Sequence, residues 1–174
     1  MEWLHYVPER RESLRTADVA ILDWHPKWAA DFRRLNEEWI TRYFELEPDD
    51  RRTLNDPEGE VIAGGGAIVV AVAEGEVVGT GALVAEGNGV YELAKMAVAP
   101  AWRGRGIGRM VAERLLRIAK ERGARKVELV SQSGLAPALR LYSSLGFRRV
   151  PVGAVAYARA DVRMELSDLE AWRR

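Results

Sequence analysis

The stretch YELAKMAVAPAWRGRGIG, residues 91–108, decides the fold. It starts as an apolar run of strand-like composition and ends in a loop with three glycines at alternate positions. These are Gly104, Gly106 and Gly108. The following residues, 109–123, carry apolar side chains at helical spacing and end in a glycine, as many helices do. The stretch therefore predicts a strand, a glycine loop and a helix in succession.

This order favours binding of a phosphate at the start of the helix, where unpaired N–H groups and the helix dipole attract negative charge. Glycines would let the backbone approach phosphate oxygens closely, and Arg103 and Arg105 would add charge-assisted hydrogen bonds. The spacing G-x-G-x-G matches neither G-x-x-x-x-G-K-[ST] nor G-x-G-x-x-G. The loop is thus interpreted as an anion site of a different kind, with a plain flexible turn as the alternative.

The flanking sequence predicts alternating helices and strands. Strands are expected at residues 18–23, in an antiparallel meander within 67–100, and at 126–130, 147–150 and 161–167. Helices are expected at residues 25–44, as a short element after Pro48, and at 109–123 and 137–146. Residues 61–73 are interpreted as a loop that leads into a buried strand.

Composition limits the class of protein. A chain of 174 residues with 48% hydrophobic and 30% charged residues is expected to form a single soluble α/β domain. The absence of cysteine excludes disulfides, zinc–thiolate sites and thiol nucleophiles, and two distant histidines do not suggest a metal site. The longest apolar run is too short to span a membrane, and the charged N-terminus does not resemble a signal peptide, so the expected location is the cytoplasm.

Charge is distributed unevenly although the net charge is zero. Residues 1–60 hold 9 Lys or Arg and 15 Asp or Glu, whereas residues 101–150 hold 12 and 3. The basic segment is expected to meet an anion and the acidic one a cation. Ordinary charged helix surfaces are the alternative interpretation.

The sequence RGRGIG, residues 103–108, resembles the acetyl-coenzyme A (acetyl-CoA) signature R/Q-x-x-G-x-G/A of the GNAT N-acetyltransferase superfamily. Residues 91–108 also resemble that family's fourth strand and third helix, and APALRLYSSLGF, residues 136–147, resembles its later helix with a Tyr-x-x-x-Gly-Phe ending. The resemblance extends over about residues 68–150. It implies one α/β (α+β) domain over residues 1–174, with 1–17 as an N-terminal extension. The sheet would be mixed and mostly antiparallel, with flanking helices and a splayed cofactor-binding strand pair.

The resemblance also implies a cofactor site. Backbone N–H groups of the glycine loop would hold the pyrophosphate of acetyl-CoA, and the free edge of the preceding strand would pair with its pantetheine. Where many members carry an asparagine before the later helix, this chain has SQSG, with Gln132 as the nearest candidate. The predicted cofactor-binding residues are Met96, Ala97, Val98, Arg103, Gly104, Arg105, Gly106, Ile107, Gly108, Arg109 and Gln132.

Two residues are candidates for catalysis. Strand alternation predicts that Glu92 shares a face with the apolar residues Val90, Ala94, Met96 and Val98, and it lies 11 positions before the signature arginine. This position resembles that of the family's general-base glutamate; a structural acid is the alternative. Tyr142 resembles the family's general acid near the cofactor sulfur, and an ordinary core aromatic is the alternative.

The predicted partner is an amine acceptor: a small amine, an amino acid or a protein lysine. Trp39, Tyr43 and Phe44 on the first long helix are candidates for lining its pocket, and core packing is the alternative. No metal and no membrane contact are expected, nucleic acid is disfavoured because no recognised motif occurs, and a homodimer is left open. The second functional hypothesis is a non-catalytic acetyl-CoA sensor.

Overall fold

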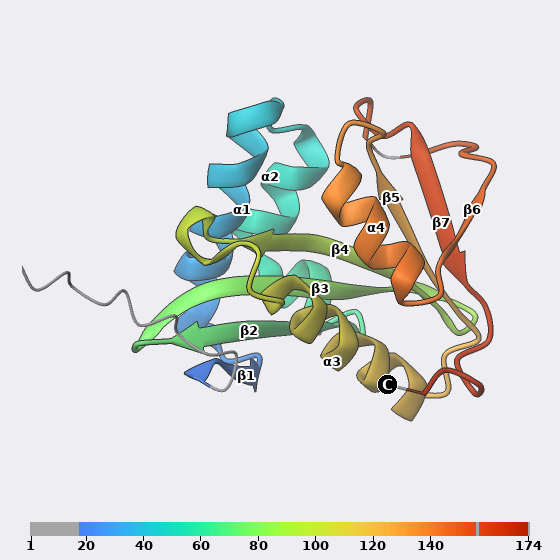
Figure 1. Cartoon of the computed structure of the whole chain (residues 1–174), viewed down its shortest axis with the longest axis horizontal. Coiled ribbons are helices and arrows are strands. Elements are labelled where there is room, and N and C mark those ends of the chain that lie inside the picture. The colour runs from blue at the N-terminus through green and yellow to red at the C-terminus, as the bar shows by residue number, and fades with distance from the viewer. Residues whose placement is uncertain (1–17, 156, 174) are drawn as a thin grey trace, which may run out of the picture.

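The structure, a computed structural model, describes residues 18–155 and 157–173 (Figure 1). The predicted N-terminal extension, residues 1–17, lies outside them. In the described residues the strands form one seven-stranded sheet in the order β1-β2-β3-β4-β5-β7-β6. The strands are β1 (Ala20–Asp23), β2 (Ala67–Ala73), β3 (Glu76–Gly87), β4 (Val90–Val98), β5 (Lys126–Ser131), β6 (Arg148–Val150) and β7 (Val162–Leu166). The helices are α1 (Ala29–Tyr43), α2 (Pro48–Asn55), α3 (Ile107–Glu121) and α4 (Ala136–Ser144), with 3₁₀ turns at Pro26–Trp28 and Pro100–Trp102.

The predicted fold class is confirmed, because the sheet is mixed and mostly antiparallel: among the ladders of residues 18–155 and 157–173, only the one between β4 and β5 is parallel. The predicted helices and strands all occur, with ends shifted by a few residues. One element was not predicted: residues Glu58–Ile62 form a short π-helix whose Val61 is buried against α1 and α2. Its last two residues overlap the start of the segment 61–73, and the buried strand expected within that segment begins at Ala67.

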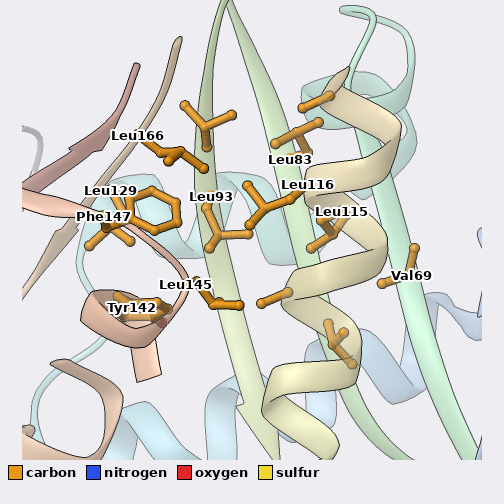
Figure 2. Packing of buried hydrophobic residues seen from close by; sticks show 14 of the residues in the cluster. Val69, Leu83, Leu93, Leu115, Leu116, Leu129, Tyr142, Leu145, Phe147 and Leu166 are labelled. Atoms are coloured by element: carbon orange, nitrogen blue, oxygen red, sulfur yellow. The ribbon is translucent and has the colours of Figure 1, made fainter. Parts of the chain in front are cut away.

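Both faces of the sheet are covered. On one face, α3 and α4 pack over β2, β3, β4 and β5 in a single large apolar cluster, part of which Figure 2 shows. On the other face, α1 and α2 cover β2, β3 and β4 in two smaller clusters. β2 illustrates the consequence: Val69 and Ala71 enter the first cluster while Ile68 and Val70 enter the other two. A strand buried on both faces has no polar side, which explains its continuous apolar sequence.

β4 contains a bulge. Its ladder with β3 pairs Ala82 with Ala94 but Thr80 with Ala97, so that Lys95 and Met96 share one position opposite Gly81. Lys95 takes the left-handed backbone conformation, with φ of 54°. An extra residue in a strand shifts the alternation of side chains by one position.

β4 and β5 separate after a short parallel ladder. In the described residues this ladder joins Val90–Glu92 to Lys126–Glu128, although β4 continues to Val98 and β5 to Ser131. Figure 1 shows β5 and β7 turning away from the direction of β4. The splayed strand pair is therefore present, and the backbone edge of β4 beyond Glu92 is free of β5.

The C-terminal segment packs on its own chain. Leu169 and Trp172 are buried, and the indole N–H of Trp172 donates to the carbonyl of Leu145 at 3.0 Å. The apolar side chains of this segment are thus used within the monomer. None of the helices in residues 18–155 and 157–173 is long and apolar enough to cross a membrane.

We expect Gly81→Ala to lower the free energy of unfolding by about 1–3 kcal/mol, because the added methyl group overpacks the bulge. A Cβ at this position would lie 2.5 Å from Met96 Sδ, 2.8 Å from Val111 Cγ1 and 3.0 Å from Leu115 Cδ1. Urea denaturation followed by circular dichroism would measure the change. An unfolding midpoint equal to that of the parent would show that the bulge and α3 are not packed as described.

Candidate active site

The backbone of the glycine loop is bare at the start of α3. Gly104 and Gly106 have φ of 74° and 79°, and a Cβ added at either would meet nothing within 4 Å. The first backbone bond of the helix runs from Met110 N–H to Gly106 O at 3.1 Å, so the N–H groups of residues 107–109 precede it. A helix leaves these groups without intrahelical acceptors. The loop can therefore receive an anion on its backbone.

The arginines of the loop have protein contacts. Arg103 Nε donates to the carbonyl of Val98 at 3.2 Å, Arg105 stacks over the Trp102 ring with 4.6 Å from Cζ to the centroid, and Arg109 donates to Ser144 Oγ. Arg103 and Arg105 are exposed. These contacts fix the loop against the end of β4 and against α4.

The other predicted cofactor residues lie around the gap between β4 and β5. Met96 and Val98 pack toward α3, whereas Ala97 is buried on the α1 face. Gly108 approaches α4, because a Cβ there would lie 3.6 Å from Leu141 Cδ2. Gln132 stabilises the turn in which it lies, because its side-chain oxygen accepts a hydrogen bond from the N–H of Gly134 at 2.6 Å.

Glu92 lies on the α1 and α2 face of the sheet. Its direct partner on β3 is Val84, which packs against the cluster of Phe32 and Leu54. The predicted alternation is wrong beyond Ala94, because the bulge sends Met96 and Val98 to the opposite face. Glu92 is also the last position of β4 that pairs with β5. Its carboxyl therefore lies at the point where the two strands separate.

Burial raises the pKa of the Glu92 carboxyl to about 7. The negative charge of Glu86, a hydrogen bond with Glu86 and the charge of Glu128 act in the same direction, while the ammonium of Lys95 opposes them. A carboxyl of this kind exchanges protons near neutral pH, as a general base for an amine requires.

Tyr142 belongs to the large apolar cluster. Its ring meets Phe147 edge-on, with 6.0 Å between centroids, and both rings belong to the cluster shown in Figure 2. Burial raises the pKa of its hydroxyl to about 12, so the phenol keeps its proton at neutral pH. A buried, protonated phenol can donate a proton to a leaving group, and it equally suits a structural aromatic.

The three aromatics predicted to line an acceptor pocket lie together, because both Trp39 and Tyr43 contact the ring of Phe44. Trp39 and Phe44 meet edge-on, with 6.1 Å between centroids, and Trp39 packs on the cluster that contains Ala97. Its indole Nε1 is buried and has no hydrogen-bond acceptor among the described residues. Tyr43 is 52% exposed and lies next to Phe44 with Arg42 over its ring.

A buried ionic network next to these residues was not predicted. Lys95 Nζ donates to Asp50 Oδ1 at 2.7 Å and to the hydroxyl of Tyr157 at 2.9 Å. The guanidinium of Arg159 donates to both carboxylate oxygens of Asp50, at 2.7 and 2.9 Å, and to Glu47 at 2.9 Å. Burial alone would raise the pKa of Asp50, but the hydrogen bonds from Arg159 and Lys95 outweigh it and hold the pKa at about 2. A lysine within the apolar row of residues 91–98 was the one sequence signal for this network.

Comparisons with known proteins agree with this geometry. A family model described as the acetyltransferase (GNAT) family matches residues 27–147. The chain is 30% identical, over 135 residues, to the uncharacterized N-acetyltransferase YjgM of Escherichia coli K12, and the match covers 72% of this chain and 81% of that protein.

Solved structures share the fold. An acetyltransferase of the GNAT family from Staphylococcus aureus Mu50 superposes with a TM-score of 0.78 at 19% identity, covering 84% of this chain and 97% of its own. The PaiA N-acetyltransferase of Thermoplasma acidophilum, solved in complex with coenzyme A, superposes with a TM-score of 0.69 at 15% identity. The match covers 86% of this chain and 98% of that one.

We expect Glu92→Gln to become more stable relative to the parent as the pH rises from 5 to 8. In the parent the unfolded carboxyl loses its proton near its ordinary pKa of 4.5 and the folded one near 7, so the folded state loses stability as the pH rises between these values. The glutamine variant does not titrate there, and the relative gain should be on the order of 2–3 kcal/mol. Urea denaturation of both proteins at pH 5 and pH 8 would measure it. A difference in stability that does not change with pH would contradict the raised pKa.

Proposed function

Because the chain belongs to the GNAT acetyltransferase family, we propose that it transfers the acetyl group of acetyl-CoA to a primary amine, with Glu92 as the general base and Tyr142 as the general acid. The observation that carries the proposal is the gap between β4 and β5. The open loop of residues 103–109 lies at one end of β4 and the carboxyl of Glu92 lies where β4 leaves β5. A donor bound along this gap would have its phosphates at the loop and its reactive end between the strands.

The residues present fit acetyl-CoA. The N–H groups of residues 107–109, together with two glycines at positive φ, leave room and donors for a pyrophosphate. The free edge of β4 at Met96–Val98 offers backbone groups to the pantetheine, as an added strand would use them. When bound, acetyl-CoA supplies an acetyl group that is activated as a thioester.

The proposed chemistry takes two protons from the acceptor nitrogen and gives one to the leaving sulfur. Glu92 would take the first proton from the acceptor ammonium, directly or through water, and pass it to solvent, because only the neutral amine attacks the carbonyl carbon. As the C–N bond forms and the C–S bond breaks, Tyr142 would donate its phenolic proton to the departing sulfur, and the second proton of the nitrogen would return through water to the Tyr142 oxygen. Backbone N–H near Val98 would stabilise the charge that develops on the carbonyl oxygen. No covalent bond to the protein is needed.

The acceptor would enter on the α1 and α2 face, where Glu92 lies. Trp39 and Phe44 are proposed to line its path, with Tyr43 at the exposed rim. A small amine, an amino acid and a protein lysine all present the amine that this chemistry requires. The cytoplasm is the proposed location, and neither nucleic acid nor a membrane is part of the proposed function.

Release of coenzyme A thiol tests the transfer. The chain has no cysteine, so the protein itself does not react with a thiol-reactive dye, and with thiol-free acceptor pools the dye reports only the product. We expect thiol release from acetyl-CoA that depends on an acceptor drawn from pools of polyamines, amino acids, aminoglycosides and lysine peptides. Glu92→Gln should lower kcat at pH 7 by about 10²-fold or more, since it removes the general base.

The matched control is Glu76→Gln, an exposed carboxylate at the start of β3 on the same sheet. It should leave kcat within twofold of the parent. Cofactor binding without any acceptor-dependent release would favour the sensor hypothesis. Full activity of Glu92→Gln would reassign the general base.

We expect Gly106→Leu to raise the dissociation constant of acetyl-CoA at least about tenfold, because a side chain would occupy the space proposed for the phosphates. Gly75→Leu is a matched control: Gly75 has φ of 77°, close to the 79° of Gly106, and a Cβ there would also meet nothing within 4 Å. Both variants should lose a similar stability, about 1–2 kcal/mol, from the left-handed backbone.

Isothermal titration calorimetry would measure binding, and thermal unfolding would measure stability. Equal affinity of the two variants for acetyl-CoA would refute the assignment of the loop.

A further inference from the structure

Two charged side chains that the proposed chemistry does not use are almost completely buried under the bulge of β4. The side chain of Lys95 is 5% exposed and that of Asp50 is 0% exposed, and they form an ion pair at 2.7 Å. Burying an ion pair is costly, and so is a left-handed backbone at a lysine. A well-packed apolar pair could fill the same space without these costs, so stability alone does not account for Lys95.

The network reaches three elements that are distant in sequence. Asp50 lies in the first turn of α2, Lys95 lies in β4, and Tyr157 and Arg159 lie in the segment that leads into β7. Arg159 and Tyr157 also stack, with 4.6 Å from the guanidinium carbon to the ring centroid. The backbone N–H of Ala158 donates to Glu47 Oε1 at 2.8 Å. Residues 157–159 are thus fastened both to α2 and to the bulge.

The network lies on the acceptor side of the proposed site. Lys95 follows Glu92 by three positions on the same strand, and its charge acts on the Glu92 carboxyl. Arg159 lies over the ring of Phe44, with 5.8 Å from Cζ to the centroid, and Phe44 meets Trp39. The arginines of the cofactor loop have other contacts, with Val98, Trp102 and Ser144.

We propose that Lys95 is a positioning residue for acetyl transfer: its ammonium holds residues 157–159 and the first turn of α2 against the bulge, and so fixes the acceptor side of the site around Glu92. This role rests on the proposed function. It predicts that loss of Lys95 affects the acceptor and the proton transfer but not the binding of acetyl-CoA.

The charges around Glu92 predict the direction in which its pKa shifts when Lys95 or Asp50 is replaced. The groups that act on its carboxyl, or that it acts on, are Glu86 of β3, Lys95 of β4, Glu128 of β5, Arg163 of β7, and Tyr157 in the segment before β7. Among those that shift the pKa of Glu92, Lys95 lowers it while Glu86 and Glu128 raise it. Asp50 neutralises Lys95 at contact distance. Removing the positive charge of Lys95 should therefore raise the pKa of Glu92, and removing the negative charge of Asp50 should lower it.

The experiment compares Lys95→Met and Asp50→Asn with the parent. For one amine acceptor, kcat/KM is measured from pH 5.5 to 9, together with the KM for that acceptor and the dissociation constant of acetyl-CoA. We expect the acidic limb of the profile to move to higher pH in Lys95→Met and to lower pH in Asp50→Asn. Both should raise the acceptor KM at least fivefold, with acetyl-CoA affinity within twofold of the parent, and Lys95→Arg should restore part of the KM.

The matched control is Arg52→Met, which removes an exposed ion-paired cation from the same helix α2. Arg52→Met should change neither the acidic limb of the pH profile nor the acceptor KM. The proposal would be overturned if the acidic limb moved in the same direction in Lys95→Met and Asp50→Asn, or if the acceptor KM of these two variants stayed at the parent value. Circular dichroism reports the fold; if Lys95→Met does not fold, Asp50→Asn and Lys95→Arg decide the question. A parent that acetylates no amine refutes the proposed function itself, and with it this role for Lys95.

Discussion

The separation of β4 from β5 is the constraint on which the rest of the structure depends. A parallel pair would ordinarily continue as long as both strands last, yet this ladder stops at Glu92 and Glu128. The apolar core holds the two halves of the sheet together in its place, because Leu93 of β4, Leu116 of α3 and Leu129 of β5 belong to one buried cluster (Figure 2). Side-chain packing replaces backbone pairing, and the backbone edge of β4 is left available.

The bulge in β4 is the second structural constraint, and it determines how the side chains of β4 are distributed between the two faces of the sheet. Without the extra residue, regular alternation would turn Met96 and Val98 toward α1, on the side of Glu92. With it, these two side chains pack under α3 while Ala97 reaches the α1 cluster. The cost is a left-handed lysine, of order 1–3 kcal/mol, which the hydrogen bonds to Asp50 and Tyr157 help to offset. Local rules are broken at the place where the proposed chemistry lies, which is where such exceptions are expected.

The helices and strands were predicted well because residues close in sequence determine them. Gly123 and Gly146 end α3 and α4 with φ of 70° and 103°, and apolar periodicity marked the helices. The bulge is not predicted by the sequence, because a strand pattern implies strict alternation of side chains. The ionic network escaped because it joins residues as far apart as Asp50 and Arg159, and the segment before β7 carries no periodic signal. Glu92 stands out as an acid in the alternating row of Val90, Ala94, Met96 and Val98, whereas Lys95 falls outside that row. The roles of Glu92, Tyr142 and the loop residues stay predictions.

The two sides of the proposed site differ in what they are made of. The cofactor side is mostly backbone: glycines, helix N–H groups and a free strand edge, which depend little on side-chain identity. The acceptor side carries the charged side chains of Glu92, Lys95, Asp50 and Arg159 beside the aromatic residues Trp39 and Phe44. There the pKa of Glu92 depends on a narrow balance between opposing charges and burial. A Glu92 carboxyl with an ordinary pKa would be ionised but too weak a base for an ammonium, and one raised much further would already hold a proton at neutral pH. Burial and Glu86 push the pKa of Glu92 upward, Lys95 restrains it, and a value of about 7 is what their opposition leaves.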